Sequence, residues 1–195
     1  MKVAIIKYNA GNIQSVEYAL QRLGISPILS DQIEELQTAD KIIFPGVGEA
    51  STAMNYLKNK GLDKLIPQLK QPVLGICLGL QLLCEHSEEN DTACMGVFKV
   101  KVKKFESESL KVPQIGWNTL QKLSNHLFAG LKEDAFVYFV HSYYAELSEQ
   151  TIAQSNYCLP FSASLHQHNF YATQFHPEKS SENGSKILEN FINLT

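Results

Sequence analysis

The sequence lacks most of the features that mark membrane, secreted, metal-binding or nucleic-acid-binding proteins. No apolar run approaches the ~18 residues that a membrane span needs, and no charged and apolar leader precedes Lys2. The four cysteines form neither a CxxC pair nor a dense disulfide framework. A net charge of −3 gives no support for a nucleic-acid partner. We therefore expect a cytoplasmic protein with reduced thiols, with no metal or cofactor and no membrane or nucleic-acid partner.

Internal repeats, low-complexity tracts and linker-like stretches are absent from the sequence as well. The chain has 195 residues, of which 44% are hydrophobic, and this is enough to bury a substantial core. We therefore predict a single domain over residues 1–195.

The first half of the chain alternates apolar runs with helical patterns. A continuous apolar run at 3–6 predicts a strand buried on both faces. Further strands are predicted at 27–29, at 41–44 and just before Cys77. Helical spacing of apolar residues predicts helices over 12–23 and from Ala50 through Leu57. This order implies an α/β fold with a doubly wound, mostly parallel sheet and helices on both faces. Ligands bind such sheets beyond the carboxyl ends of the strands.

The second half predicts added antiparallel strands. Strictly alternating residues over 98–103 indicate a half-exposed strand, whose lysines form a solvated face. Further short strands are predicted at 136–144, 151–154, 160–165 and 170–175, with a hairpin turn at 168–169. A helix over about 182–194 ends the chain.

The most informative stretch is Gly75-Ile76-Cys77-Leu78-Gly79, which ends an apolar run and begins a helical pattern. It has the form of a nucleophile elbow, in which the nucleophile occupies strained backbone and the flanking glycines relieve crowding. A helix that starts at the cysteine would stabilise a thiolate through its dipole. A lone cysteine at a strand end is more often a core residue, but the two glycines favour a catalytic nucleophile.

A candidate base follows in His176-Pro177-Glu178. Proline restricts His176 to extended backbone, so that the carboxylate of Glu178 can reach one imidazole nitrogen while the other nitrogen faces the thiol. His176 could equally be a turn residue hydrogen-bonded to backbone. His141 either lines the same site or has a structural role, and the remaining four histidines have the polar surroundings of surface groups.

The sequence Pro45-Gly46-Val47-Gly48 follows an apolar strand and precedes a helix. It could be a simple connecting turn. Beside a cysteine elbow it is also a candidate source of backbone N–H groups for an oxyanion, together with the N–H of Leu78.

These motifs together resemble the class I (triad) glutamine amidotransferases, and the resemblance covers essentially the whole chain. It implies that Cys77 attacks the side-chain amide of glutamine and that His176 and Glu178 complete a catalytic triad. It also implies an oxyanion hole formed by Gly46, Val47, Gly48 and Leu78, and a substrate site that includes Gln81, Ser142 and Tyr143.

Finer elements, among them Val112-Pro113-Gln114-Ile115-Gly116-Trp117-Asn118, resemble the amidotransferase subunits of histidine biosynthesis. This resemblance implies that ammonia from L-glutamine passes to a (β/α)8-barrel synthase subunit in a heterodimer. We expect the interface near Asn12, Trp117, Tyr138 and Lys179. Two alternatives are a glutaminase subunit of another pathway, such as surface-sugar biosynthesis, and a stand-alone cysteine hydrolase. A non-catalytic binding module would have no use for the triad residues.

Overall fold

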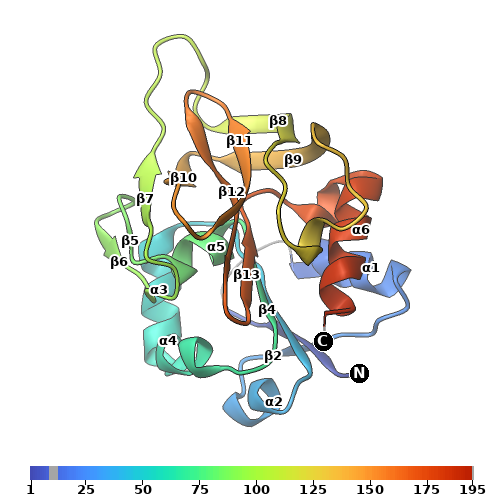
Figure 1. Ribbon diagram of the computed structural model, residues 1–195. Helices are drawn as coiled ribbons and strands as arrows, with labels where there is room; N and C mark the ends of the chain where they lie inside the picture. Colours follow the sequence, from blue (N-terminus) through green and yellow to red (C-terminus); the bar gives the residue numbers. More distant parts are fainter. Residues whose placement is uncertain (9–12, 195) are drawn as a thin grey trace.

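The computed structural model describes residues 1–8 and 13–194, and its centre is a mixed sheet (Figure 1). Five parallel strands lie side by side in the order β2 (Ile28–Ser30), β1 (Val3–Ile6), β3 (Lys41–Phe44), β4 (Val73–Ile76) and β13 (Phe170–Thr173). The sheet continues through β12 (Pro160–Gln167), β10 (Tyr143–Ala145) and β7 (Lys101–Lys104), which join one another in antiparallel pairs. The predicted fold class is therefore confirmed, including the antiparallel strands of the second half.

Further strands complete the architecture. The strands β5 (His86–Ser87) and β6 (Thr92–Ala93) extend the sheet beyond β7, and β11 (Thr151–Asn156) pairs with β12. A separate antiparallel pair, β8 (Gln114–Leu120) and β9 (Ala135–His141), crosses the top of Figure 1. Of these strands, β5, β6 and β8 were not predicted from the sequence.

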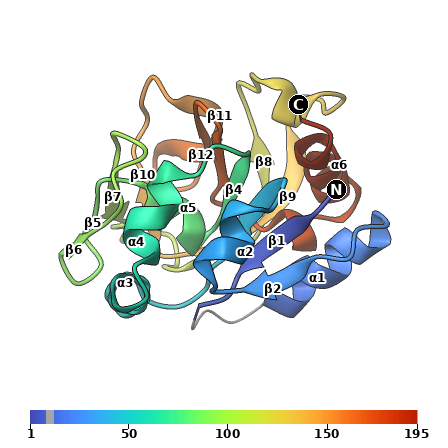
Figure 2. The ribbon, with the colours of Figure 1, turned by 90° about the horizontal axis from the view of Figure 1, so that it is seen from below.

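Helices cover both faces of the parallel strands (Figure 2). One side carries α1 (Ile13–Arg22) and α6 (Ser181–Ile192); the other carries α2 (Ile33–Gln37), α3 (Ala50–Asn59), α4 (Leu62–Leu65) and α5 (Leu78–Leu83). Strand β1 shows why both faces are apolar: Val3 and Ile5 join the core beneath α1 and α6, whereas Ala4 and Ile6 join the core beneath α3 and α5. Short 3-10 helices lie at Ile66–Gln68, His126–Phe128 and Pro177–Lys179.

Several boundaries differ from the prediction for physical reasons. The strand predicted at 98–103 begins only at Lys101, because Phe98 donates its backbone N–H to Leu83 and Val100 accepts from Glu85. The strand predicted at 136–144 is two strands, β9 and β10, which belong to different sheets and meet at Ser142. The predicted hairpin turn is confirmed, with His168 at φ 54 between β12 and β13.

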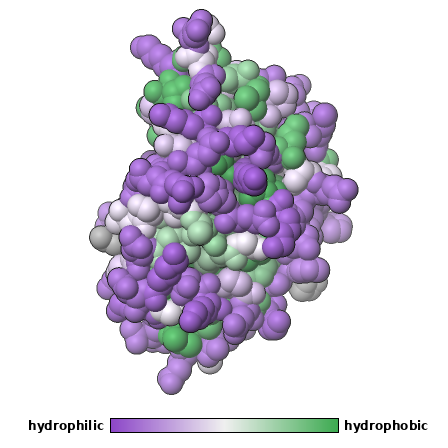
Figure 3. Space-filling view, turned by 90° about the vertical axis from the view of Figure 1, so that its left-hand side faces the viewer, coloured by the Kyte–Doolittle hydropathy of each residue, from purple (hydrophilic) through white to green (hydrophobic). Residues whose placement is uncertain are grey.

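The lysines of β7 lie on a solvated surface, as predicted, while Val102 between them is fully buried. The side of the molecule that carries β5, β6 and β7 is mainly hydrophilic, with hydrophobic residues in scattered groups (Figure 3). Among the described residues no helix is long and apolar enough to cross a bilayer.

Candidate active site

Cys77 lies on a sharp turn between β4 and α5, with φ 55 and ψ −107. Close packing explains the glycines on either side. A Cβ on Gly79 would lie 1.9 Å from the carbonyl oxygen of Phe44, and one on Gly75 would lie 2.8 Å from Leu83 Cδ1. Since real Cβ atoms do not approach so closely, only glycine lets α5 pack this tightly against β3 and β4. The predicted strained elbow is confirmed.

Strand pairing brings His176 to the same edge of the sheet. Strand β13 pairs in parallel with β4, so that Thr173 stands opposite Ile76 and accepts a hydrogen bond from the Cys77 N–H at 2.7 Å. His176 follows three residues later with extended backbone, at φ −97 and ψ 96. Its own N–H donates to Tyr138 and its carbonyl accepts from Ser180 Oγ at 2.6 Å. The backbone around the imidazole is therefore fixed from both sides.

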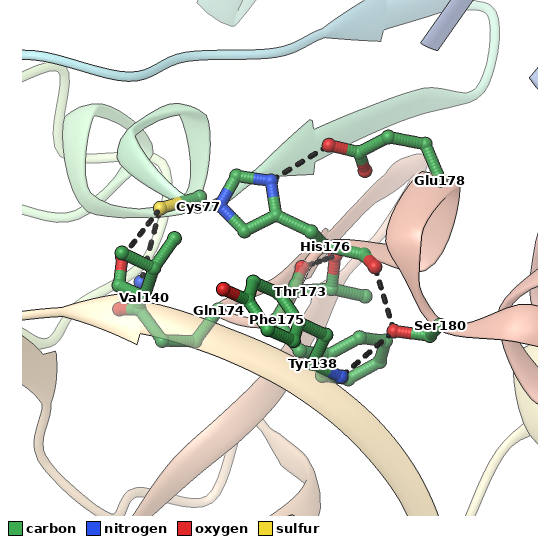
Figure 4. Close-up of polar contacts among 9 residues, drawn as sticks. All are labelled: Cys77, Tyr138, Val140, Thr173, Gln174, Phe175, His176, Glu178 and Ser180. Atoms are coloured by element: carbon green, nitrogen blue, oxygen red, sulfur yellow. Dashed lines mark hydrogen bonds and ion pairs between the residues drawn. The ribbon is translucent and has the colours of Figure 1, made fainter. Parts of the chain in front are cut away.

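The imidazole of His176 lies between a carboxylate and a thiol (Figure 4). Its Nδ1 is 2.7 Å from Glu178 Oε1, and both side chains are 1% exposed. The other ring nitrogen faces Cys77. Burial lowers the pKa of His176, but the charge of Cys77 and hydrogen bonds to Cys77 and Glu178 outweigh it and raise this pKa to about 10. The arrangement therefore favours an imidazolium beside the sulfur.

The sulfur of Cys77 also meets two polar groups from other elements. It lies 3.8 Å from the Val140 carbonyl oxygen and 3.7 Å from Gln174 Nε2 (Figure 4). Gln174 in turn accepts a hydrogen bond from Gln81 Nε2 at 3.0 Å, and Gln81 also donates to the Tyr143 carbonyl at 3.0 Å. Gln174 thus links the Cys77 sulfur to Gln81. It was not predicted, because a lone glutamine after a strand carries no motif.

A cavity of about 280 Å³ opens beside the sulfur, at the small end of the usual range for ligand sites. Most of the residues predicted for the site line it: Val47, Gly48, Cys77, Leu78, Gln81, Ser142 and Tyr143. Gly46 is buried and does not line the cavity; a Cβ there would lie 2.1 Å from the Tyr8 hydroxyl. Within the described residues no three His, Cys, Asp or Glu side chains are grouped so as to hold a metal ion.

Glu89 is a lining residue that was not predicted from the sequence. Burial raises its pKa, although its Oε2 accepts a hydrogen bond from the Ala50 N–H at 2.8 Å. Among the described lining residues it is the one with an acidic side chain. Its position depends on the turn between two very short strands, for which the sequence carries no clear periodic signal.

His141 lines the cavity as well, which agrees with the first of its two predicted roles. It is buried, its Nδ1 lies 2.7 Å from the Tyr143 carbonyl oxygen, and its Nε2 lies 3.0 Å from Gln114 Oε1. Burial lowers the pKa of His141 to about 4. An imidazole with this lowered pKa is neutral at pH 7 and has a single N–H to donate; it supports the walls of the cavity.

A carbonyl group of the loop that precedes α3 accepts a hydrogen bond from the N–H that was predicted to bind the oxyanion. The N–H of Leu78 donates to the carbonyl oxygen of Gly46 at 3.2 Å, and the Tyr8 hydroxyl donates to that of Pro45 at 2.6 Å. Gly48 has φ +117 and open space around the position of a Cβ. The loop is thus fixed at Pro45 and Gly46, and it is exposed at Gly48.

Three of the four predicted interface residues come together near Glu178. Trp117 and Tyr138 face each other across β8 and β9 with ring centroids 6.0 Å apart, and Lys179 Nζ lies 6.0 Å from the centre of the Tyr138 ring. Trp117, Glu178 and Lys179 share an open groove of about 690 Å³. The fourth residue, Asn12, lies outside the described part of the chain.

Comparison with known proteins gives one consistent family. Residues 4–194 match the family glutamine amidotransferase class-I. The imidazole glycerol phosphate synthase subunit HisH of Bacteroides thetaiotaomicron is 57% identical, and the match covers 100% of both chains. The protein of the same name from Idiomarina loihiensis is 41% identical over 100% of this chain and 99% of its own.

Solved structures share the fold at lower identity. A putative GMP synthase subunit from Thermoplasma acidophilum superposes with a TM-score of 0.75 at 23% identity, covering 98% of this chain and 92% of its own. The structure of PurLQS from Thermotoga maritima gives a TM-score of 0.75 at 18% identity, covering 98% of this chain and 97% of its own. The elbow cysteine, its imidazole and carboxylate, and a family match over nearly the whole length agree: the chain belongs to the class-I glutamine amidotransferases.

Proposed function

We propose that this protein is the glutaminase subunit of an imidazole glycerol phosphate synthase in histidine biosynthesis. It hydrolyses L-glutamine to glutamate and ammonia, and a separate synthase subunit consumes the ammonia. The observation that carries the proposal is the triad geometry beside a small cavity, in a chain 57% identical over its full length to a protein named as that subunit.

Cys77 is the nucleophile of the proposed reaction, and His176 and Glu178 complete the triad. The thiolate attacks the amide carbon of the glutamine side chain and forms a C–S bond. When the tetrahedral intermediate collapses, the C–N bond breaks and the His176 imidazolium gives a proton to the departing nitrogen. His176 then takes a proton from the water that cleaves the thioester, which releases glutamate. Glu178, 2.7 Å from Nδ1, stabilises the imidazolium and fixes its orientation.

The cavity provides groups for both ends of a glutamine molecule. The carboxylate of Glu89 is a partner for the α-ammonium group of the substrate. Gln81 and the backbone of Ser142 and Tyr143, which also line the cavity, hold the rest of the amino acid. These assignments give a role to the polar residues that line the cavity beside the Cys77 sulfur.

The oxyanion hole, in this proposal, is completed by movement of the Gly46–Gly48 loop. The donor N–H of Leu78 is engaged by the Gly46 carbonyl, 3.2 Å away. Hydrolysis therefore requires this hydrogen bond to open and an N–H of Val47 or Gly48 to turn toward the oxyanion. A missing oxyanion donor costs about 2.7–4 kcal/mol, so the loop would keep the subunit slow until its partner binds.

The partner is proposed to be a (β/α)8-barrel subunit that forms a heterodimer with this chain. The outer face of β8 and β9 supports an interface there, because Ile115, Trp117 and Phe136 are 64%, 53% and 56% exposed. Their cross-strand neighbours, Val140, Tyr138 and Thr119, belong to the same face. Exposed aromatic side chains of this kind are typical binding anchors. An interface also keeps ammonia away from water, where it would be protonated.

One assay tests the proposal. Glutamate release from L-glutamine is measured for the protein alone and with a (β/α)8-barrel synthase subunit from the same organism. We expect slow turnover alone and strong stimulation by the partner, with loss of both in Cys77→Ala. Full activity without any partner would favour a stand-alone hydrolase, and stimulation by a synthase of another pathway would overturn the assignment to histidine biosynthesis.

A further inference from the structure

The turn between β5 and β6 joins the substrate cavity to the oxyanion loop. It carries Glu89, which lines the cavity, and Asn90, whose Nδ2 donates to Glu49 Oε1 at 2.8 Å. Glu49 directly follows Gly48, the exposed end of the Gly46–Gly48 loop. One short turn therefore contributes to the proposed ammonium site and also contacts Glu49, the residue at which the movable Gly46–Gly48 loop ends.

Glu49 is the residue that holds that end of the loop. It is the N-cap of α3: Oε1 accepts from the Ser51 N–H at 2.8 Å, and Oε2 accepts from the N–H and hydroxyl of Thr52 at 3.0 and 2.5 Å. Hydrogen bonds from Ser51, Thr52 and Asn90 lower the pKa of Glu49 to about 2. A carboxylate with this many donors has one orientation, and Asn90 is the donor that comes from outside α3.

The turn is itself well fixed. Glu89 donates its backbone N–H to Ser87 Oγ at 3.2 Å and accepts from Thr92 Oγ1 at 2.6 Å, and both of these side chains are buried. Glu89 also accepts from the Ala50 N–H, so the turn meets the first turn of α3 at two points. A force on Glu89 is therefore transmitted to α3 and Glu49.

We infer that Asn90 and Glu49 are positioning residues that couple occupancy of the glutamine site to the conformation of the Gly46–Gly48 loop. The inference rests on the proposed function. In the empty site the two carboxylates, Glu49 and Glu89, repel each other across the start of α3. An α-ammonium group bound at Glu89 removes that repulsion, and the turn then closes more firmly on Glu49. Substrate thus fixes one end of the oxyanion loop, with Tyr8 and Pro45 fixing the other.

Replacement of Asn90 by glycine tests the coupling. Asn90 has φ 52, which glycine adopts without strain, so Asn90→Gly removes the amide and keeps the turn. We expect kcat for glutamine hydrolysis to fall about tenfold per active site, as for the loss of one charge-assisted hydrogen bond, with little change in KM. Active sites are counted by titration with an electrophilic glutamine analogue. Asp91→Gly is the matched control, because Asp91 has φ 49 and its side chain pairs with His86 instead.

Two further measurements separate positioning from a structural role. Asn90→Asp keeps the shape and sets a second carboxylate against Glu49, so we expect a larger loss than in Asn90→Gly. Alkylation of Cys77 by iodoacetamide forms no oxyanion, and its rate should stay at the wild-type value in all these variants. Equal losses in Asn90→Gly and Asp91→Gly, an unimpaired Asn90→Asp, or slower alkylation would overturn the inference.

The coupling is also measurable without turnover. In Cys77→Ala, glutamine should slow hydrogen exchange at the Ser51 and Thr52 amides, which bind Glu49, and it should not do so in Cys77→Ala with Asn90→Gly. Equal protection in both proteins would refute the coupling. If wild-type protein with its partner releases no glutamate, the proposed function itself fails; if it does and Asn90→Gly matches it, only the coupling fails.

Discussion

Replacement of Glu178 by glutamine separates the carboxylate's part in catalysis from that of the imidazole. The change keeps the shape of the side chain and removes its charge, at a position where the carboxylate is 2.7 Å from His176 Nδ1 and 1% exposed. Glutamine still reaches Nδ1, but it no longer stabilises the imidazolium. His176→Ala removes the group that carries the proton, so it should lower kcat more than Glu178→Gln does.

The structure sets the magnitudes. A hydrogen bond to a charged group contributes about 1.5–3 kcal/mol, so Glu178→Gln should lower kcat by roughly 10- to 100-fold. Loss of a general acid and base costs more, and His176→Ala should lower kcat by at least ~10³-fold. The assay is glutamate release at saturating glutamine and saturating partner, with rates divided by titrated active sites. Glu182→Gln, on the exposed first turn of α6, is the control and should match wild type.

The pH profile gives an independent measurement of the same interaction. The pKa of His176 is raised to about 10 in part by Glu178, so Glu178→Gln should lower that pKa. The alkaline fall of kcat/KM, where the imidazolium loses its proton, should then begin at lower pH than in wild type. An unchanged alkaline limb, or equal losses in His176→Ala and Glu178→Gln, would refute the assigned roles.

Four further predictions concern the nucleophile, the loop, the interface and His141. A diazo-ketone analogue of glutamine should label Cys77 and spare the other three cysteines; mass spectrometry that finds another cysteine modified would contradict the elbow assignment. Gly48→Pro should bind glutamine but hydrolyse it poorly even with partner present, and normal turnover would argue against a moving loop. Trp117→Ala and Lys179→Ala should weaken stimulation by the partner and ammonia transfer, and normal coupling in both would exclude that interface. The pKa of His141 in the folded protein is about 4, below its ordinary 6.5, so the free energy of unfolding should fall as pH drops from about 6.5 to about 4. Denaturation curves measured over this pH range test the prediction, and the same fall in His141→Gln would contradict it.

The sequence predicted those parts of the fold whose signals are local. Strand β1 matches its apolar run residue for residue, because a strand buried on both faces favours apolar side chains at successive positions. Strand β3 also has its predicted bounds, although its first residue is the buried Lys41. The elbow was predictable from its glycines, and close packing requires one of them: a Cβ on Gly79 would lie 1.9 Å from the Phe44 carbonyl oxygen. His176 and Glu178 were predictable because proline between them limits the backbone to few conformations.

Features that depend on distant partners were not predictable in this way. Strand β8 contains two glycine or asparagine positions and alternates weakly, and it exists because β9 pairs with it along its whole length. Glu89 reaches the cavity only because a short turn packs against α3. Both cases are set by tertiary contacts, which override weak local preference.

The position of β13 has a consequence for synthesis of the protein. This strand, which delivers His176, pairs with both β4 and β12, although it lies about a hundred residues after β4 in the chain. In the proposed mechanism, the thiol of Cys77 therefore has no base until the chain through His176 has left the ribosome and β13 has entered the sheet between its two neighbours. A growing chain that has not yet reached β13 carries Cys77, the proposed nucleophile, without the His176 imidazole that would activate it. Nascent or truncated molecules should therefore consume no glutamine, and the reaction should begin only with the finished fold.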